Sequence, residues 1–166
     1  MEELLLCMDG ETEQYEKLIN LNEEKKDSII HQKLDALEAI TIEEQSIADS
    51  LLNLEKKRVH VLRNMATVMG RDGEEITVSW MINNLSNQPL EQEQLREAKE
   101  KLVSAADKVR IYNTQNQNLL KQAIEMVEFD INLVKASRQA PQTSNYGRDA
   151  VTTGSLLGRS GFDAKQ

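Results

Sequence analysis

The sequence predicts an all-α protein, an elongated antiparallel bundle or coiled coil of three long helices plus a short connecting helix, with a flexible C-terminal tail. Of the 166 residues, 29% are charged and only 4% aromatic, which is typical of long helices rather than of a compact α/β core. Apolar residues recur at alternating spacings of three and four through most of residues 1–137. We therefore expect a helical bundle domain at 1–137 and a tail at 138–166.

The first helix is expected from Met1 to about Gln32. Its apolar or large residues fit an alternation of four and three, which is interrupted by polar residues at Glu11, Asn22 and Lys25. A polar residue in an apolar seam weakens packing, but it can fix the register and the choice of partner. Asp35 is the expected N-cap of the next helix.

The second helix has the most regular pattern. Ten positions follow spacings of three and four, and all but two of them are apolar: Leu37, Ile40, Glu44, Ile47, Leu51, Leu54, Arg58, Val61, Met65 and Val68. Such spacing over about five heptads predicts coiled-coil packing. Gly70 and Gly73 follow, and they predict a C-cap and a turn.

A short connecting helix is expected within residues 76–86, with Trp80, Met81 and Leu85 on one face. We favour the interpretation that this face closes one end of the bundle, because a short amphipathic helix is usually buried against its neighbours. The alternative is an exposed anchor for a partner protein.

The third long helix is expected from the turn at residues 86–89, with Pro89 in its first turn, to about Ser137. One stripe at spacings of three and four runs along it: Leu95, Ala98, Leu102, Ala105, Val109, Tyr112, Asn116, Leu119, Ala123, Met126, Asp130 and Leu133. A second stripe begins weakly at Val103 and Ala106 and becomes fully apolar only after Gln117.

The last turns of this helix are apolar over a wide arc, since ten of the sixteen residues between Leu119 and Val134 are apolar. Two interpretations remain open. The wide face seats the helix between two others of the bundle, or it is a groove kept for a helix of another protein. The candidate client-binding groove consists of Leu119, Leu120, Ile124, Val127, Ile131 and Val134.

The tail has a composition that cannot form a core, yet it carries Tyr146 next to Gly147. One rigid aromatic ring in a flexible segment is typical of a short docking motif that becomes ordered on its partner. The alternative is that Tyr146 folds back onto the bundle.

Several classes of function are disfavoured. His31 and His60 lie on different expected helices, and no metal-ligand spacing or phosphate-binding loop is visible, so we expect no enzyme, cofactor or metal. Cys7 is the only cysteine and is expected to fill a helix face. A net charge of −8 disfavours nucleic acid, and acidic helices disfavour membrane binding. The absence of a signal peptide or membrane span predicts a cytoplasmic protein.

Four stretches together resemble FlgN, the flagellar type III export chaperone for hook-associated (hook–filament junction) proteins. They are LINLNEEKKDSI at 18–29, LDALEAITIEEQSIADSLLNLEKKR at 34–58, NTQNQNLLKQAIE at 113–125 and the late NYG at 145–147. The resemblance covers nearly the whole chain, and the order of its parts is more specific than any one of them.

The resemblance implies a cytoplasmic chaperone without catalytic activity. It implies that the protein binds the amphipathic terminal helices of FlgK and FlgL, prevents their premature self-association and delivers them to the cytoplasmic domain of the export gate protein FlhA. Tyr146 matches the tail tyrosine implicated in this docking, whereas Ala150 stands where the family has a glycine. The alternative from another class is a structural coiled-coil protein that self-associates and has no secretion client.

Overall fold

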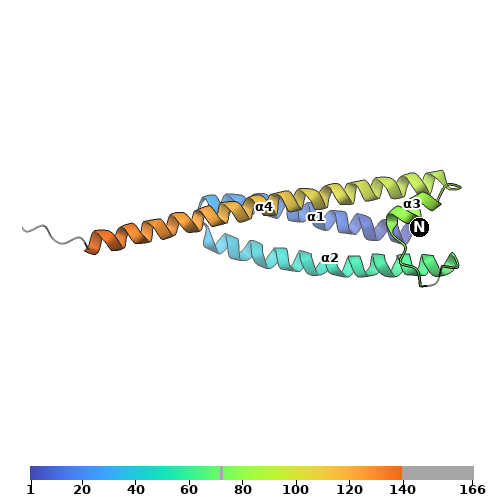
Figure 1. The fold of residues 1–166 in the computed structure, drawn as a ribbon, viewed down its shortest axis with the longest axis horizontal. Helices are drawn as coiled ribbons and strands as arrows, with labels where there is room; N and C mark the ends of the chain where they lie inside the picture. Colours follow the sequence, from blue (N-terminus) through green and yellow to red (C-terminus); the bar gives the residue numbers. More distant parts are fainter. Residues whose placement is uncertain (72, 140–166) are drawn as a thin grey trace, which may run out of the picture.

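The computed structural model describes residues 1–71 and 73–139. They form four helices, α1 (Glu2–Ile30), α2 (Leu34–Val68), α3 (Val78–Asn84) and α4 (Pro89–Gln139). Figure 1 shows an elongated molecule in which the three long helices lie side by side and α3 lies at one end. The described residues contain no strand, so the predicted all-α fold class is confirmed.

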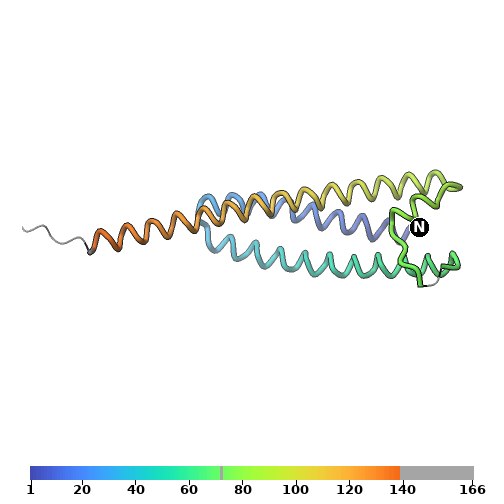
Figure 2. Tube along the Cα trace, in the orientation of Figure 1, coloured from blue at the N-terminus to red at the C-terminus, as the bar shows by residue number. Residues whose placement is uncertain are grey.

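Consecutive long helices are antiparallel, whereas α1 and α4 run in the same direction (Figure 2). The chain reverses once between α1 and α2 and again, at the other end, through the segment that contains α3. α1 packs against both α2 and α4, while α2 and α4 approach each other much less closely. α1 is therefore the central helix of the bundle.

The largest cluster of buried side chains lies at the end of the bundle that contains α3. It joins all four helices and the loop before α3, through Leu4, Met8, Val61, Leu62, Ala66, Ile76, Val78, Met81, Ile82, Leu85, Leu95 and Ala98. A smaller cluster of Leu21, Ile40 and Ile47 joins α1 and α2 near their connection. Most of the apolar burial that stabilises the fold is thus concentrated at one end.

The expected connecting helix is α3, and it closes that end of the bundle as predicted. Thr77 is its N-cap and accepts a hydrogen bond from the backbone N–H of Trp80. Met81 and Leu85 are buried in the large cluster, while Trp80 is only half-buried. The guanidinium of Arg71 lies 4.9 Å from the centre of the Trp80 ring, a cation–π contact that ties the preceding loop to α3.

The ends of α1 and α2 have the same hydrogen-bond pattern, a Schellman motif. After α2, Arg71 N–H donates to the Ala66 carbonyl, and Gly70 has a positive φ of 72°. After α1, Lys33 N–H donates to the Ser28 carbonyl, and Gln32 takes the equivalent position with a φ of 53°. The predicted end of α2 with a glycine turn is confirmed: its C-cap is Met69, and Gly70 is the left-handed residue that follows. α1 ends in the same way, with Gln32 in place of the glycine.

The predicted N-cap at Asp35 is wrong. α2 begins at Leu34, its N-cap is Lys33, and no side chain caps it by a hydrogen bond. The reason is the Schellman motif, which uses Lys33 to end α1 and leaves the chain already turned into the next helix. Asp35 lies in the first turn instead, where its negative charge complements the helix dipole.

Candidate functional site: an exposed apolar arm of α4

The polar residues in the helix seams contact one another across the bundle. Arg58 of α2 donates from Nε to both carboxylate oxygens of Glu11 in α1, at 2.9 and 3.0 Å. Glu11 is buried, so this pair satisfies a charge that would otherwise be costly inside the bundle. The pair lies between the two apolar clusters and fixes the register of α1 against α2.

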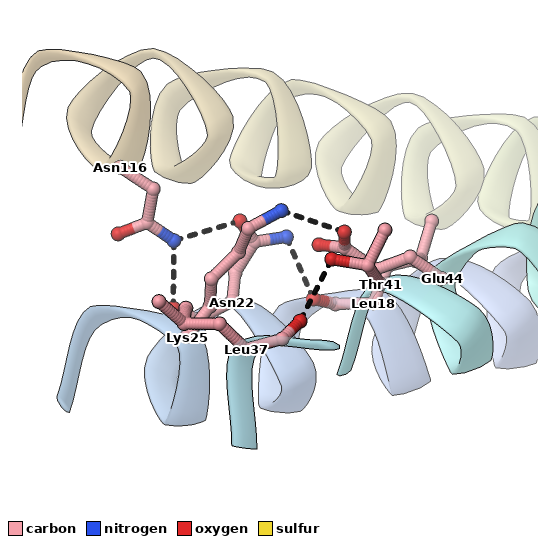
Figure 3. Close-up of polar contacts among 7 residues, drawn as sticks. All are labelled: Leu18, Asn22, Lys25, Leu37, Thr41, Glu44 and Asn116. Carbon is pink, nitrogen blue, oxygen red and sulfur yellow. Dashed lines mark hydrogen bonds and ion pairs between the residues drawn. The ribbon is translucent and has the colours of Figure 1, made fainter. Parts of the chain in front are cut away.

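A second polar group lies towards the other end of the bundle (Figure 3). Lys25 Nζ of α1 donates to Glu44 Oε2 of α2 at 2.6 Å. Asn116 Nδ2 of α4 donates to both the backbone carbonyl and the side-chain oxygen of Asn22, at 2.8 and 3.0 Å. Asn22 and Asn116 are buried. These contacts hold the helices together.

Beyond Asn116, α4 extends past the ends of the other helices. α1 ends eight residues after Asn22, so α4 continues for roughly 15 residues, or about 20 Å, past the end of α1. Figure 1 shows this last part of α4 projecting beyond the connection between α1 and α2. We call residues 119–139 the arm; its first five residues lie beside the last turn of α1, and the rest project beyond it.

The predicted site residues lie on this arm. Leu119 is half-buried, whereas Leu120, Ile124, Val127, Ile131 and Val134 are all exposed, Ile124 by 50%. Every side chain from Ile124 to Arg138 is exposed. The interpretation that two other helices of the bundle cover this wide face therefore does not hold.

The predicted groove residues do not line a groove between helices. Leu119 and Leu120 lie beside the last turns of α1, whereas Val127, Ile131 and Val134 lie beyond the end of α1, on one face of a single projecting helix. Apolar side chains that the prediction left out extend the same surface, including Met126, Leu133 and Phe129, which is 66% exposed. The first apolar stripe of the sequence, which continues into the arm, identifies Met126 and Leu133, whereas Phe129 lies outside both stripes.

The apolar surface of the arm consists of two adjacent seams. Seam 1 continues the stripe that packs on α1 and contains Leu119, Ala123, Met126, Asp130 and Leu133. Seam 2 contains Leu120, Ile124, Val127, Ile131 and Val134. At about 100° of rotation per residue, the two seams lie roughly 100° apart around the helix. The charged residues Lys121, Glu125, Glu128 and Lys135 lie on the remaining side.

A second apolar surface, which the sequence did not single out, lies in the bundle itself. Because α2 and α4 are not closely packed, a cleft of about 370 Å³ opens between them, and its lining includes Tyr15, Leu51, Leu52, Leu102 and Val103. The Glu11–Arg58 pair also lines it, so a charged pair interrupts the apolar lining of this cleft. The arm is the stronger candidate for a protein-binding surface.

A family model described as FlgN protein matches residues 1–154. The chain belongs to the FlgN family. The match spans all four helices of this FlgN-family protein, including the arm, and continues into the segment after α4. No curated protein and no solved structure matches the chain. Membership indicates a flagellar export chaperone, since FlgN is a family of chaperones and not of enzymes.

Two features that the sequence singled out, metal-ligating side chains and the lone cysteine, can be followed in the described part of this FlgN chain. Residues 1–71 and 73–139 contain no group of three or more His, Cys, Asp or Glu side chains able to hold a metal ion. Burial raises the pKa of the Cys7 thiol, and the nearby carboxylates of Glu3 and Glu11 raise it further, which is the opposite of what a nucleophile needs. Among those same residues, no helix is long and apolar enough to cross a lipid bilayer.

The predicted docking residues of this FlgN chain, Tyr146 and Gly147, lie outside the described residues. Both lie inside the range that the family model matches. Their role in docking therefore stays a prediction.

Proposed function

We propose that this FlgN-family chaperone holds the amphipathic terminal helices of the hook-associated proteins FlgK and FlgL in the cytoplasm and prevents them from self-associating before export. The observation that carries the proposal is the exposed apolar face of the arm. Family membership supports the class of client, because a flagellar export chaperone must cover a client surface that would otherwise associate too early.

The arm is suited to an amphipathic helix by its shape and composition. An apolar stripe at helical spacing along a straight helix is the surface that a second amphipathic helix packs on, side by side. Exposed apolar surfaces of this extent are uncommon on monomeric proteins unless they bind something. Association and ordering costs offset part of the burial energy, which leaves a reversible affinity suited to a chaperone that must release its client.

The two seams support the binding of more than one client helix. Upstream of the arm, the stripe of seam 1 is the surface on which α1 packs, and it includes the buried residues Leu95, Ala105 and Val109. A client helix on seam 1 would therefore continue the position of α1 beyond its end. Seam 2 leads back to Val103 in the cleft between α2 and α4, so a second client helix would lie on the other side of α4 from α1.

Delivery to the export gate is the second half of the proposal. We assign it to Tyr146 and Gly147, which follow the arm and match the docking tyrosine of the family. The proposed partner is the cytoplasmic domain of FlhA. A docking motif outside the apolar seams lets the gate bind the chaperone while the client still occupies the arm.

The client-binding proposal is tested by Ile124→Asp in the full chain, with binding to purified FlgK and FlgL measured by calorimetry. Ile124 lies in the middle of seam 2 and is half exposed, so the new charge should abolish binding of the client helix and leave the helical circular dichroism signal unchanged. The matched control is Asn132→Asp, which adds the same charge on the polar side of the arm and should bind normally.

Two outcomes would contradict the proposal. Unchanged client binding by Ile124→Asp would exclude the arm as the client-binding site. A wild-type protein that binds no client, but forms a dimer that Ile124→Asp dissociates in sedimentation experiments, would favour the self-associating coiled-coil alternative.

The docking proposal has a separate test. Tyr146→Ala should leave client affinity unchanged and weaken binding of the chaperone–client complex to the FlhA cytoplasmic domain. Loss of client binding in this variant would contradict a docking role that is separate from the arm.

A further inference from the structure

Polar residues at the seam positions that pack between helices have partners on another helix. Each partner is itself a seam residue of its own helix, so one polar group lies against another. The pairs are Glu11 with Arg58, Lys25 with Glu44, and Asn22 with Asn116. Such pairs specify register, because a shift of either helix would leave a buried charge or amide without its partner.

Asp130 interrupts seam 1 in the same way, two heptads after Asn116. Its neighbours three and four residues away on the helix are all apolar: Met126, Val127, Leu133 and Val134. Within residues 1–71 and 73–139, no ion pair or side-chain hydrogen bond involves Asp130. It is thus a single carboxylate in the middle of the apolar arc, exposed and without a cation beside it.

We infer that the helix that occupies seam 1 carries one lysine or arginine facing Asp130. This inference rests on the proposed function, since it describes the helix that the arm binds. A helix that covers seam 1 removes water from the carboxylate, and leaving that charge unpaired costs several kcal/mol. A cation at the facing position satisfies it, as Arg58 satisfies Glu11, and it sets the register of the bound helix.

The charge pattern of the arm disfavours a second copy of this chain as the occupant. Lys121 and Lys135 lie roughly 160° from the middle of seam 1 at about 100° per residue, so an arm paired through seam 1 cannot present either of them to Asp130. Two parallel arms in register would instead place the two Asp130 carboxylates against each other, and like charges repel. The complementary partner is therefore a different chain with a basic residue in its apolar seam.

The test uses three synthetic helical peptides of about three heptads, with an apolar seam whose central position is Lys, Gln or Glu. Their binding to the full-length chaperone is measured by fluorescence anisotropy, for the wild type, Asp130→Lys and the matched control Glu128→Lys. The control makes the same change in net charge on the polar side of the arm, so it separates the local contact from general attraction by a protein with a net charge of −8.

We expect the Lys peptide to bind the wild type about tenfold more tightly than the Glu peptide, with Gln between them, since close charge pairs at interfaces couple by at least that much. Asp130→Lys should reverse the order, and Glu128→Lys should keep it. The same order in all three proteins would overturn the inference, and so would equal binding of the three peptides to the wild type, while the arm would remain a helix-binding site. Failure of every peptide to bind would count against both the inference and the proposed site.

Discussion

Asn116 of α4 and Asn22 of α1 form the only buried side chain–side chain amide contact in the described residues, with Asn116 Nδ2 3.0 Å from Asn22 Oδ1. Asn22 in turn donates from its Nδ2 to the Leu18 carbonyl. The contact lies beyond the large apolar cluster, where few apolar side chains join α4 to α1. It is the last hydrogen bond between α4 and α1 before the arm begins.

Asn116→Ala should destabilise the bundle by about 1–3 kcal/mol, because it leaves the buried oxygen of Asn22 without its donor. Urea unfolding followed by circular dichroism measures this free energy. The double variant Asn22→Ala/Asn116→Ala should lose less than the sum of the two single changes. Additive losses would mean that the two amides are not coupled.

The sequence predicted the seam positions of these polar residues but not their pairing. The spacing of the stripe identifies Glu11, Asn22, Lys25, Arg58 and Asn116 as interruptions, because spacing depends only on one helix. Which of them meet depends on the register between helices and on the direction of α4 relative to α1, and neither is a property of a single stripe. The pairing of these polar residues could therefore be determined only from the structure.

The arm shows a signal that the sequence contained and the interpretation did not use. α4 has 51 residues, whereas α1 and α2 have 29 and 35. The helices expected from the sequence were already unequal in this way, with the last one the longest. Three helices of such unequal length, joined by tight connections at both ends, must leave part of the longest one unpaired. Length at 1.5 Å per residue predicts a projecting helix, where composition alone suggested a groove.

Arg58→Leu should destabilise the protein by about 3–5 kcal/mol, since it leaves the carboxylate of Glu11 buried without a cation. The loss is measured by thermal or urea unfolding. In the double variant Glu11→Leu/Arg58→Leu, both charges are gone and apolar side chains fill the space, so stability should return to the wild-type level or exceed it. A double variant as unstable as the single one would show that the pair contributes through packing rather than charge.

Gln32→Gly should stabilise the protein by about 0.5–1 kcal/mol, because Gln32 holds a left-handed backbone conformation that glycine adopts without steric cost. The change is small enough to need a two-state unfolding curve in urea. Gln32→Ala is the matched control, since alanine keeps the Cβ and should give no gain. Stabilisation by alanine as well would assign the effect to the side chain of Gln32 instead of its backbone.

Cys7 should react slowly with thiol reagents in the folded protein. The reactive form is the thiolate, and burial together with Glu3 and Glu11 raises the pKa of the folded thiol above its ordinary value of 9.0. Because the folded pKa is the higher one, the contribution of this group to stability is complete below pH 9.0 and is lost as pH rises through the folded pKa. The labelling rate should rise steeply when urea unfolds the chain.

The control for Cys7 is a variant whose only thiol lies on an exposed position of the same bundle, Cys7→Ala/Ser104→Cys. Its thiol should react at the rate of a free thiol both with and without urea. Equal labelling rates for the wild type and for this control variant under native conditions would contradict the buried placement of Cys7.

The rate of amide hydrogen exchange should differ between two parts of α4, with the boundary near Ile124. Before this point α4 packs on α1, and amides there exchange only through large openings, whereas after it α4 has no helix beside it and unfolds locally at low cost. A helix of this length is marginal in water by itself and depends on the packed turns that precede it. We expect amides after Ile124 to exchange about tenfold faster, or more, than those between Leu95 and Asn116.

Addition of FlgK or FlgL should slow exchange in the arm and leave the packed part of α4 unchanged. The measurement is mass spectrometry of peptides from both parts, at two concentrations of the chaperone so that self-association is detected. Protection of the free arm that equals that of the bundle, and that does not depend on concentration, would mean that the exposed apolar surface is covered within a single chain. Such a result would remove the surface on which client binding depends.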